Sequence, residues 1–144
     1  MREINSEGFH LLKTFEGCKL AAYRDIGGVL TIGYGHTGPD VKEGDQISQQ
    51  QADDLLKKDL ERFYQLDHYV SEQVNDNQYS AMICLAYNIG LGALKTSGII
   101  REVNDGNSPD SIWLQYNHVK GVVITGLTRR RKAELELYHK LEAV

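Results

Sequence analysis

The chain has 144 residues, of which 41% are hydrophobic and 25% are charged. These proportions are typical of one globular domain, and they exclude a disordered chain. Its 16 lysines and arginines against 20 acidic residues give a net charge of −4, which excludes a strongly basic nucleic-acid binder on bulk charge. No apolar run approaches the roughly 20 residues that cross a bilayer, and residues 1–7 hold no apolar signal sequence. We therefore expect a chain made in the cytoplasm, without membrane insertion.

The N-terminal segment predicts a helix that ends at Glu16. Ser6 is a residue type that caps helices, and the helix would carry Phe9, Leu12 and Phe15. Gly17 follows immediately and supplies a C-terminal stop.

A glycine-rich stretch, residues 17–38, comes next. It contains three short β-like runs, at residues 19–23, 29–32 and 34–37. Short strands punctuated by glycine are typical of antiparallel pairing with tight turns. We expect a small antiparallel sheet over about residues 17–46.

The remainder of the chain predicts helices. Ser48 followed by Gln51 is a capping box, which opens a long helix to about Leu66. Further helices are expected at residues 77–89 (closed by Gly90 and Gly92), 97–103, 109–116 and 127–140. The predicted fold class is α+β, as one domain over residues 1–144. Its sheet subregion is joined by the long helix to a helical lobe, about residues 48–140 plus the N-terminal helix, with a substrate cleft between them.

Two carboxyls and a hydroxyl surround the predicted sheet. Glu16 stands beside Phe15, where partial desolvation lets a carboxyl keep its proton near neutral pH and act as a general acid. Asp25 falls in a turn where water keeps it ionised, and Thr31 offers a hydroxyl that can hold a water. Two carboxyls in contrasting environments are what glycoside hydrolysis requires, although a solvated surface carboxyl is the commoner case.

The spacing of Glu16, Asp25 and Thr31, with the run TIGYGHT at residues 31–37, resembles the phage-type lysozymes, or endolysins, of glycoside hydrolase family 24. Residues 77–90 are similar to the central buried helix of that family. Residues 126–134, GLTRRRKAE, are similar to its C-terminal signature. The resemblance covers about residues 5–140 and implies a lysozyme-like fold.

The resemblance also implies a reaction. A muramidase hydrolyses the β-1,4 bond between N-acetylmuramic acid and N-acetylglucosamine in bacterial peptidoglycan, which lyses the host cell. In family terms Glu16 protonates the leaving oxygen, while Asp25 and Thr31 position a water. Inversion at the anomeric carbon is implied, with carboxyls about 6.5–9.5 Å apart.

The resemblance implies a monomer whose partner is peptidoglycan. We expect it to remain in the host cytoplasm until a holin-made pore gives access to the wall. We expect no cofactor, and no metal because the five histidines show no ligand spacing.

Three residues are candidates for contact with the glycan. Leu30 and Tyr34 suit the apolar faces of sugar rings, and core packing is the alternative for both. His118 occupies a position that in relatives lies across the cleft from the acid, so it would pair with Glu16. The alternative is a solvated surface histidine. The chain departs from the family at Tyr116, where many members have tryptophan, and at Lys120, which replaces a glycine.

Several other side chains have structural interpretations. We expect His36 to anchor the predicted sheet to a neighbouring carboxylate, and Cys18 and Cys84 to be buried thiols. The basic run 129–132 is expected to be a solvated face, with Arg130–Glu134 and Lys132–Glu136 pairs at helical spacing. Attraction of this run to the anionic wall is the functional alternative.

Two other functions compete with hydrolysis. A lytic transglycosylase would use Glu16 alone and form an anhydro sugar, whereas a non-catalytic wall-binding protein would need none of the three residues. The intact set of Glu16, Asp25 and Thr31 favours the hydrolase. The acidity of the chain does not oppose it, because residues 40–67, with 8 acids and 4 bases, account for the whole negative excess.

Overall fold

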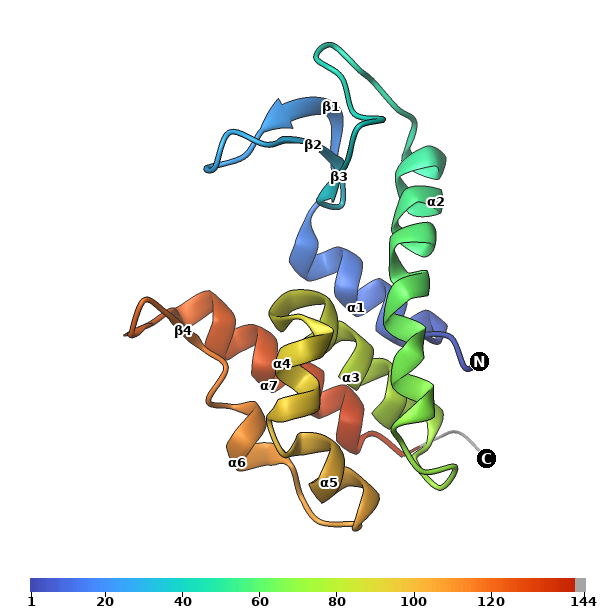
Figure 1. The fold of residues 1–144 in the computed structure, drawn as a ribbon, viewed down its shortest axis with the longest axis vertical. Helices are drawn as coiled ribbons and strands as arrows, with labels where there is room; N and C mark the ends of the chain where they lie inside the picture. The colour runs from blue at the N-terminus through green and yellow to red at the C-terminus, as the bar shows by residue number, and fades with distance from the viewer. Residues whose placement is uncertain (142–144) are drawn as a thin grey trace. The chain divides into compact units, whose positions relative to one another are not determined.

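The computed structural model describes residues 1–141, which form two compact units. One unit is Leu12–Arg62; the other is Met1–Leu11 with Phe63–Val144, of which 142–144 lie outside the described residues. Figure 1 shows the helices and strands of both units. No helix within residues 1–141 combines the length and apolar character needed to span a membrane.

Helix α1, Ser6–Glu16, ends where the sequence predicts but begins with a different cap. The side chain of Asn5, and not that of Ser6, accepts a hydrogen bond from the backbone N–H of Gly8 at 2.9 Å. At the other end Gly17 has φ +69°, a left-handed conformation that terminates helices, and its N–H bonds the Lys13 carbonyl at 3.1 Å. Glycine is also required at Gly8, because an added Cβ would lie 2.7 Å from Cβ of Ser80.

The predicted antiparallel sheet is present, in the order β1-β2-β3. Its strands are β1 (Lys19–Arg24), β2 (Leu30–Gly33) and β3 (His36–Thr37). The third strand is shorter than predicted, because Tyr34 and Gly35 form the β2–β3 turn, with Gly35 at φ +87°. Residues 45–47 bond to the outer edge of β1, which covers an otherwise exposed strand edge.

The capping box of helix α2, Gln49–Leu60, is confirmed. Ser48 accepts from the N–H of Gln51, whose side chain bonds back to the N–H of Ser48. The predicted long α-helix is wrong beyond Leu60, because the chain tightens there into the 3₁₀ helix η1, Glu61–His68. Buried Ala52 packs on the sheet, and its Cβ lies 3.6 Å from where a Cβ on Gly33 would stand.

Helix α3, Asp76–Ile89, forms the centre of the helical unit, and every residue from Tyr79 to Ala86 is buried. Asn75 caps it with a second capping box, whose other member is Gln78. Helix α7, Thr125–His139, packs along α3. This arrangement confirms the expectation of a buried central helix.

The short elements of the helical unit differ most from prediction. Gly92 does not close the preceding helix but lies within α4, Leu91–Thr96, and α5 follows at Ile99–Asn104. The helix predicted at 109–116 is a single turn, α6, Asp110–Trp113. A two-stranded hairpin, β4 (His118–Val119) and β5 (Val122–Val123), was not predicted. Lys120 and Gly121 in its turn both have positive φ angles, as a two-residue hairpin turn of type I′ requires.

Candidate active site

Glu16 is the last residue of α1, and its side chain is partly buried. The backbone there is fixed from both directions. The N–H of Gly17 bonds back to Lys13 in the preceding turn, while the Lys13 side chain forms an ion pair with Asp53 of α2 at 3.3 Å. The carboxyl is therefore carried on a helix end that these two bonds hold in place.

Asp25 begins the turn between β1 and β2, and its side chain organises that turn. Its Oδ1 accepts the N–H of Val29 at 2.9 Å, and its own N–H donates to the Val29 carbonyl at 3.0 Å. Arg24 braces the same turn by donating to the Gly28 carbonyl at 2.9 Å. Asp25 is exposed, as the sequence predicts for a turn residue next to glycines.

Thr31 lies on β2 and is 4% exposed. Its hydroxyl donates to the Val29 carbonyl at 2.9 Å, which fixes the rotamer and leaves the oxygen lone pairs as acceptors. Thr31 pairs with Tyr23 across the antiparallel ladder. Since cross-strand partners share a face of the sheet, Thr31 and Tyr23 project from the same side.

The β1–β2 hairpin thus unites Asp25 and Thr31, and both belong with Glu16 to the unit Leu12–Arg62. The three predicted catalytic residues therefore come from α1, the β1–β2 turn and β2. A carboxyl on a helix end, an exposed carboxyl on a braced turn and a fixed hydroxyl are groups that can act as a proton donor, a proton acceptor and a hydrogen-bonding anchor for water.

The three predicted glycan-contact residues have different environments. Tyr34 is 7% exposed, and its hydroxyl accepts from Gln49 at 2.9 Å, so its ring belongs to the core of the sheet unit. Leu30 is partly exposed. His118 is exposed on β4 in the other unit, where its Nδ1 lies 3.2 Å from the Gln115 carbonyl. Contact of Leu30, Tyr34 or His118 with a sugar stays a prediction, as does the pairing of His118 with Glu16.

His36 is confirmed as the anchor of the sheet. Its Nδ1 lies 2.8 Å from a carboxylate oxygen of Asp59 on α2, and its Nε2 lies 2.9 Å from Asp40. Partial burial lowers the pKa of His36, but the hydrogen bonds to the two carboxylates outweigh burial and raise the pKa above its usual 6.5. Asp59 was not identified from the sequence as the partner of His36. An aspartate on the helix that follows the strand of the histidine is the feature that indicates such a partner.

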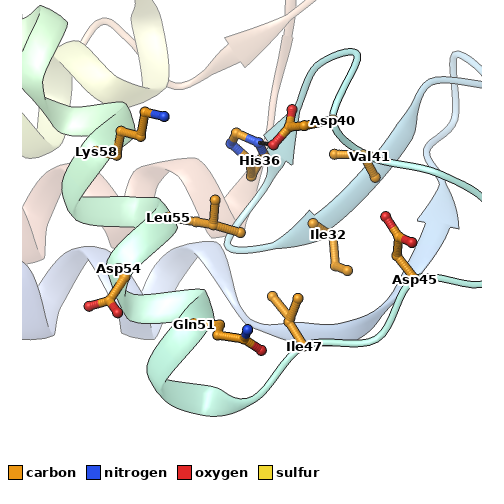
Figure 2. Close-up of a pocket in the computed structure, with 10 residues that line it drawn as sticks. All are labelled: Ile32, His36, Asp40, Val41, Asp45, Ile47, Gln51, Asp54, Leu55 and Lys58. Atoms are coloured by element: carbon orange, nitrogen blue, oxygen red, sulfur yellow. Dashed lines mark hydrogen bonds and ion pairs between the residues drawn. The ribbon is translucent and has the colours of Figure 1, made fainter.

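A hollow of about 360 Å³ lies beside this histidine, between the sheet and α2 (Figure 2). Ile32 lines it and follows Thr31 on β2, so the two side chains point to opposite faces of the sheet. The hollow is therefore on the face that turns away from Thr31. Figure 2 shows Leu55 and Ile47 near Ile32, with charged groups around them.

The expectation of a solvated basic face at residues 129–132 is wrong for two of its members. Arg130 is 5% exposed and Arg131 is fully buried, because both bind Glu134, which is also fully buried. Nε of Arg130 donates to Oε2 of Glu134 at 3.1 Å, and Nη2 of Arg131 donates to the same oxygen at 2.9 Å. Other guanidinium protons reach the carbonyls of Cys84 and Tyr116. These two arginines stabilise the fold. Only the other two cations of the run, Arg129 and Lys132, remain for an attraction to the anionic wall.

Trp113 completes this cluster. It is fully buried and donates its indole N–H to Oε1 of Glu134 at 3.1 Å. Burial raises the pKa of Glu134, but two guanidinium groups at hydrogen-bond distance favour its ionised form at neutral pH. Burial likewise lowers the pKa of Arg131.

Neither Cys18 nor Cys84 forms a disulfide. Cys84 is buried as expected, whereas Cys18 is only partly buried. Among residues 1–141 no group of three His, Cys, Asp or Glu side chains is arranged to hold a metal ion.

Comparison with known proteins gives the family and confirms the fold. The family model named phage lysozyme matches residues 13–134. An endolysin from Bacillus phage B103 is 37% identical over 140 residues, which covers 94% of this chain and 53% of that protein. Among solved structures, a P22 lysozyme mutant has a TM-score of 0.88 at 36% identity, over 97% of this chain and 100% of that one.

A second solved structure, the muramidase domain of SpmX from Asticaccaulis excentricus, has a TM-score of 0.89 at 30% identity, over 98% of this chain and 100% of that one. These structures confirm the predicted fold. The chain spans just over half the length of the endolysins from Bacillus phages B103 and PZA, 53% and 55%.

Proposed function

Because this chain belongs to the phage lysozyme family, we propose that it is a muramidase. It hydrolyses the β-1,4 bond between N-acetylmuramic acid and N-acetylglucosamine in bacterial peptidoglycan, and so lyses the host cell. The observation that carries this proposal is the placement of Glu16, Asp25 and Thr31 in one compact unit, on a helix end and one braced hairpin.

Each of the three residues has a distinct role in the proposed reaction. Glu16 gives its proton to the glycosidic oxygen as the bond to the anomeric carbon breaks. Asp25 accepts a proton from the attacking water, and Thr31 holds that water through the lone pairs of its oxygen. The water oxygen then bonds to the anomeric carbon, and the sugar ring passes through a state that resembles an oxocarbenium ion.

The stereochemical outcome is part of the same proposal. A water placed between the sugar and Asp25 attacks the face opposite the leaving group, which inverts the anomeric carbon. Inverting enzymes keep their two carboxyls about 6.5–9.5 Å apart to admit this water. We expect the first product to carry the α configuration, which proton NMR of a fresh digest measures.

Substitution of Glu16 by Gln tests the activity. The variant keeps the size of the side chain but cannot donate the proton, so we expect it to lose wall lysis and to fold normally. Glu7→Gln is the matched control, because Glu7 is an exposed glutamate at the other end of α1. Purified peptidoglycan is digested, and the masses of the new glycan ends are measured by mass spectrometry. Appreciable lysis by Glu16→Gln would refute the assignment, and an anhydro product from the wild type would identify a transglycosylase.

The route to the wall and the oligomeric state are proposed from the family resemblance. The protein acts as a monomer and reaches peptidoglycan from the host cytoplasm when a holin opens the membrane. Expression in bacteria with and without a holin tests the route, since lysis should need both proteins. Light scattering of the purified chain tests the monomer.

A further inference from the structure

A group of polar side chains connects the catalytic helix end to the sheet, and we call it the Asp53 network. Asp53 of α2 binds Nζ of Lys13 through Oδ2 at 3.3 Å. Its Oδ1 accepts from Nε2 of Gln49 at 3.0 Å, and the same amide nitrogen donates to the Tyr34 hydroxyl at 2.9 Å. The network therefore joins three elements, α1, the first turn of α2 and the β2–β3 turn.

The two ends of the network lie next to catalytic residues along the chain. Lys13 is one turn before Glu16 on α1, and its carbonyl accepts the N–H of Gly17, which follows the acid. Tyr34 comes three residues after Thr31, directly beyond the last residue of β2. A shift of α1 relative to the sheet would thus change the bond lengths at Asp53 and the position of Glu16 relative to Thr31.

The components are built to hold a fixed geometry. The side chains of Lys13 and Asp53 are 26% and 21% exposed, and Tyr34 is 7% exposed, so water competes weakly for their bonds. Burial raises the pKa of Asp53, but hydrogen bonds from Gln49, Lys13 and Tyr34 outweigh burial and hold the pKa below its usual value. The carboxylate therefore stays ionised and keeps its partners throughout the neutral range.

We propose that the Asp53 network positions the general acid Glu16 relative to Thr31, an inference that rests on the proposed muramidase function. In this proposal its members do not contact the reacting atoms. They act by holding the end of α1 in place while the proton is transferred. A small displacement of a catalytic group lowers the rate of the chemical step, because the reacting atoms leave their attack geometry.

The chain contains a matched pair for the test. Gln49 and Gln50 are neighbours in the first turn of α2, and each donates to an aspartate four residues later, at 3.0 and 2.9 Å. Only Gln49 also reaches Tyr34. We expect Gln49→Met to lower kcat on the order of tenfold with KM within about twofold. Gln50→Met should keep both constants, and soluble peptidoglycan fragments are the substrate.

Recovery of kcat by a conservative substitution distinguishes a positioning role of the network from a general loss of stability. Lys13→Arg keeps a cation that reaches Asp53, so it should retain most of the wild-type kcat, whereas Lys13→Met should lose as much as Gln49→Met. Thermal unfolding of each variant is measured in parallel. If Gln49→Met fails to fold, Tyr34→Phe removes only one hydroxyl and should lower kcat in the same sense.

The outcomes distinguish this inference from the proposed function. Equal kcat values for the Gln49 and Gln50 variants, or a rise confined to KM, would overturn the positioning role. A Lys13→Arg variant as slow as Lys13→Met would overturn it as well. In those cases an inactive Glu16→Gln variant still supports a muramidase, and an active one overturns the function itself.

Discussion

The buried glutamate of α7 offers a sharp test of how the helical unit is stabilised. Glu134→Gln keeps the shape of the side chain but removes the anionic group that binds Arg130 and Arg131. Both guanidinium groups would then lose the carboxylate that balances their charge in the protein interior. The indole N–H of Trp113 would keep an acceptor only if the new amide turned its oxygen toward the ring.

The size of the effect follows from the burial. Removing one partner from a buried ion pair costs about 3–5 kcal/mol, because the charge left behind has lost its hydration. Glu134 and Arg131 are both fully buried, so solvent cannot reduce this cost. For a chain of this length the entropy of unfolding converts that cost into a fall in Tm of about 10–17 °C.

Circular dichroism on heating and in urea measures the change at fixed pH. Glu136→Gln is the control, since Glu136 is exposed on the same helix and the substitution should change the free energy of unfolding by less than about 0.5 kcal/mol. If Glu134→Gln were as stable as Glu136→Gln, the cluster would not stabilise the fold through its charge, and the cost expected from burial would be refuted.

Two further predictions concern the unit that carries the candidate catalytic residues. Because the pKa of His36 is raised in the folded state, its contribution to stability is complete below about pH 6.5 and is lost as pH rises through the raised pKa. The free energy of unfolding of the wild type should therefore fall over this window, and that of His36→Gln should change less; parallel pH curves would contradict this role. At Gly17, an added Cβ meets no atom within 4 Å but φ is +69°, so Gly17→Ala should cost about 1 kcal/mol through backbone strain alone. Urea unfolding should show a smaller loss for Gly17→Asn, because asparagine tolerates this conformation, and equal losses would assign the cost to another cause.

The sequence predicted helix ends and turns correctly where residues close together in the chain determine them. Ser48 and Gln51 are three residues apart and cap α2 through bonds between their own side chains and backbone, so the helix start needs no other partner. Gly17 ends α1 for a similar local reason. Asp25 and Thr31 fall on one hairpin because the intervening glycines favour a turn between two short strands. The hairpin that carries Asp25 and Thr31 was therefore predictable from local sequence, whereas the choice of Glu16, Asp25 and Thr31 as a catalytic set rested on the family resemblance.

Burial of polar groups was decided by partners far away in the chain. Arg130 and Arg131 have the sequence pattern of a solvated helix face, and the pairing of Arg130 with Glu134 follows from their helical spacing. Their burial depends on the indole of Trp113 and the carbonyls of Cys84 and Tyr116, which come from other elements and complete the enclosure. Tyr34 likewise lies in the core, where its hydroxyl accepts a hydrogen bond from Gln49, fifteen residues later. Length, composition and a net charge of −4 determined the class of protein and excluded a basic nucleic-acid binder. Only the tertiary structure decided which charges are buried, since an ionised side chain leaves water only where folding assembles its counter-charge and hydrogen-bond partners around it.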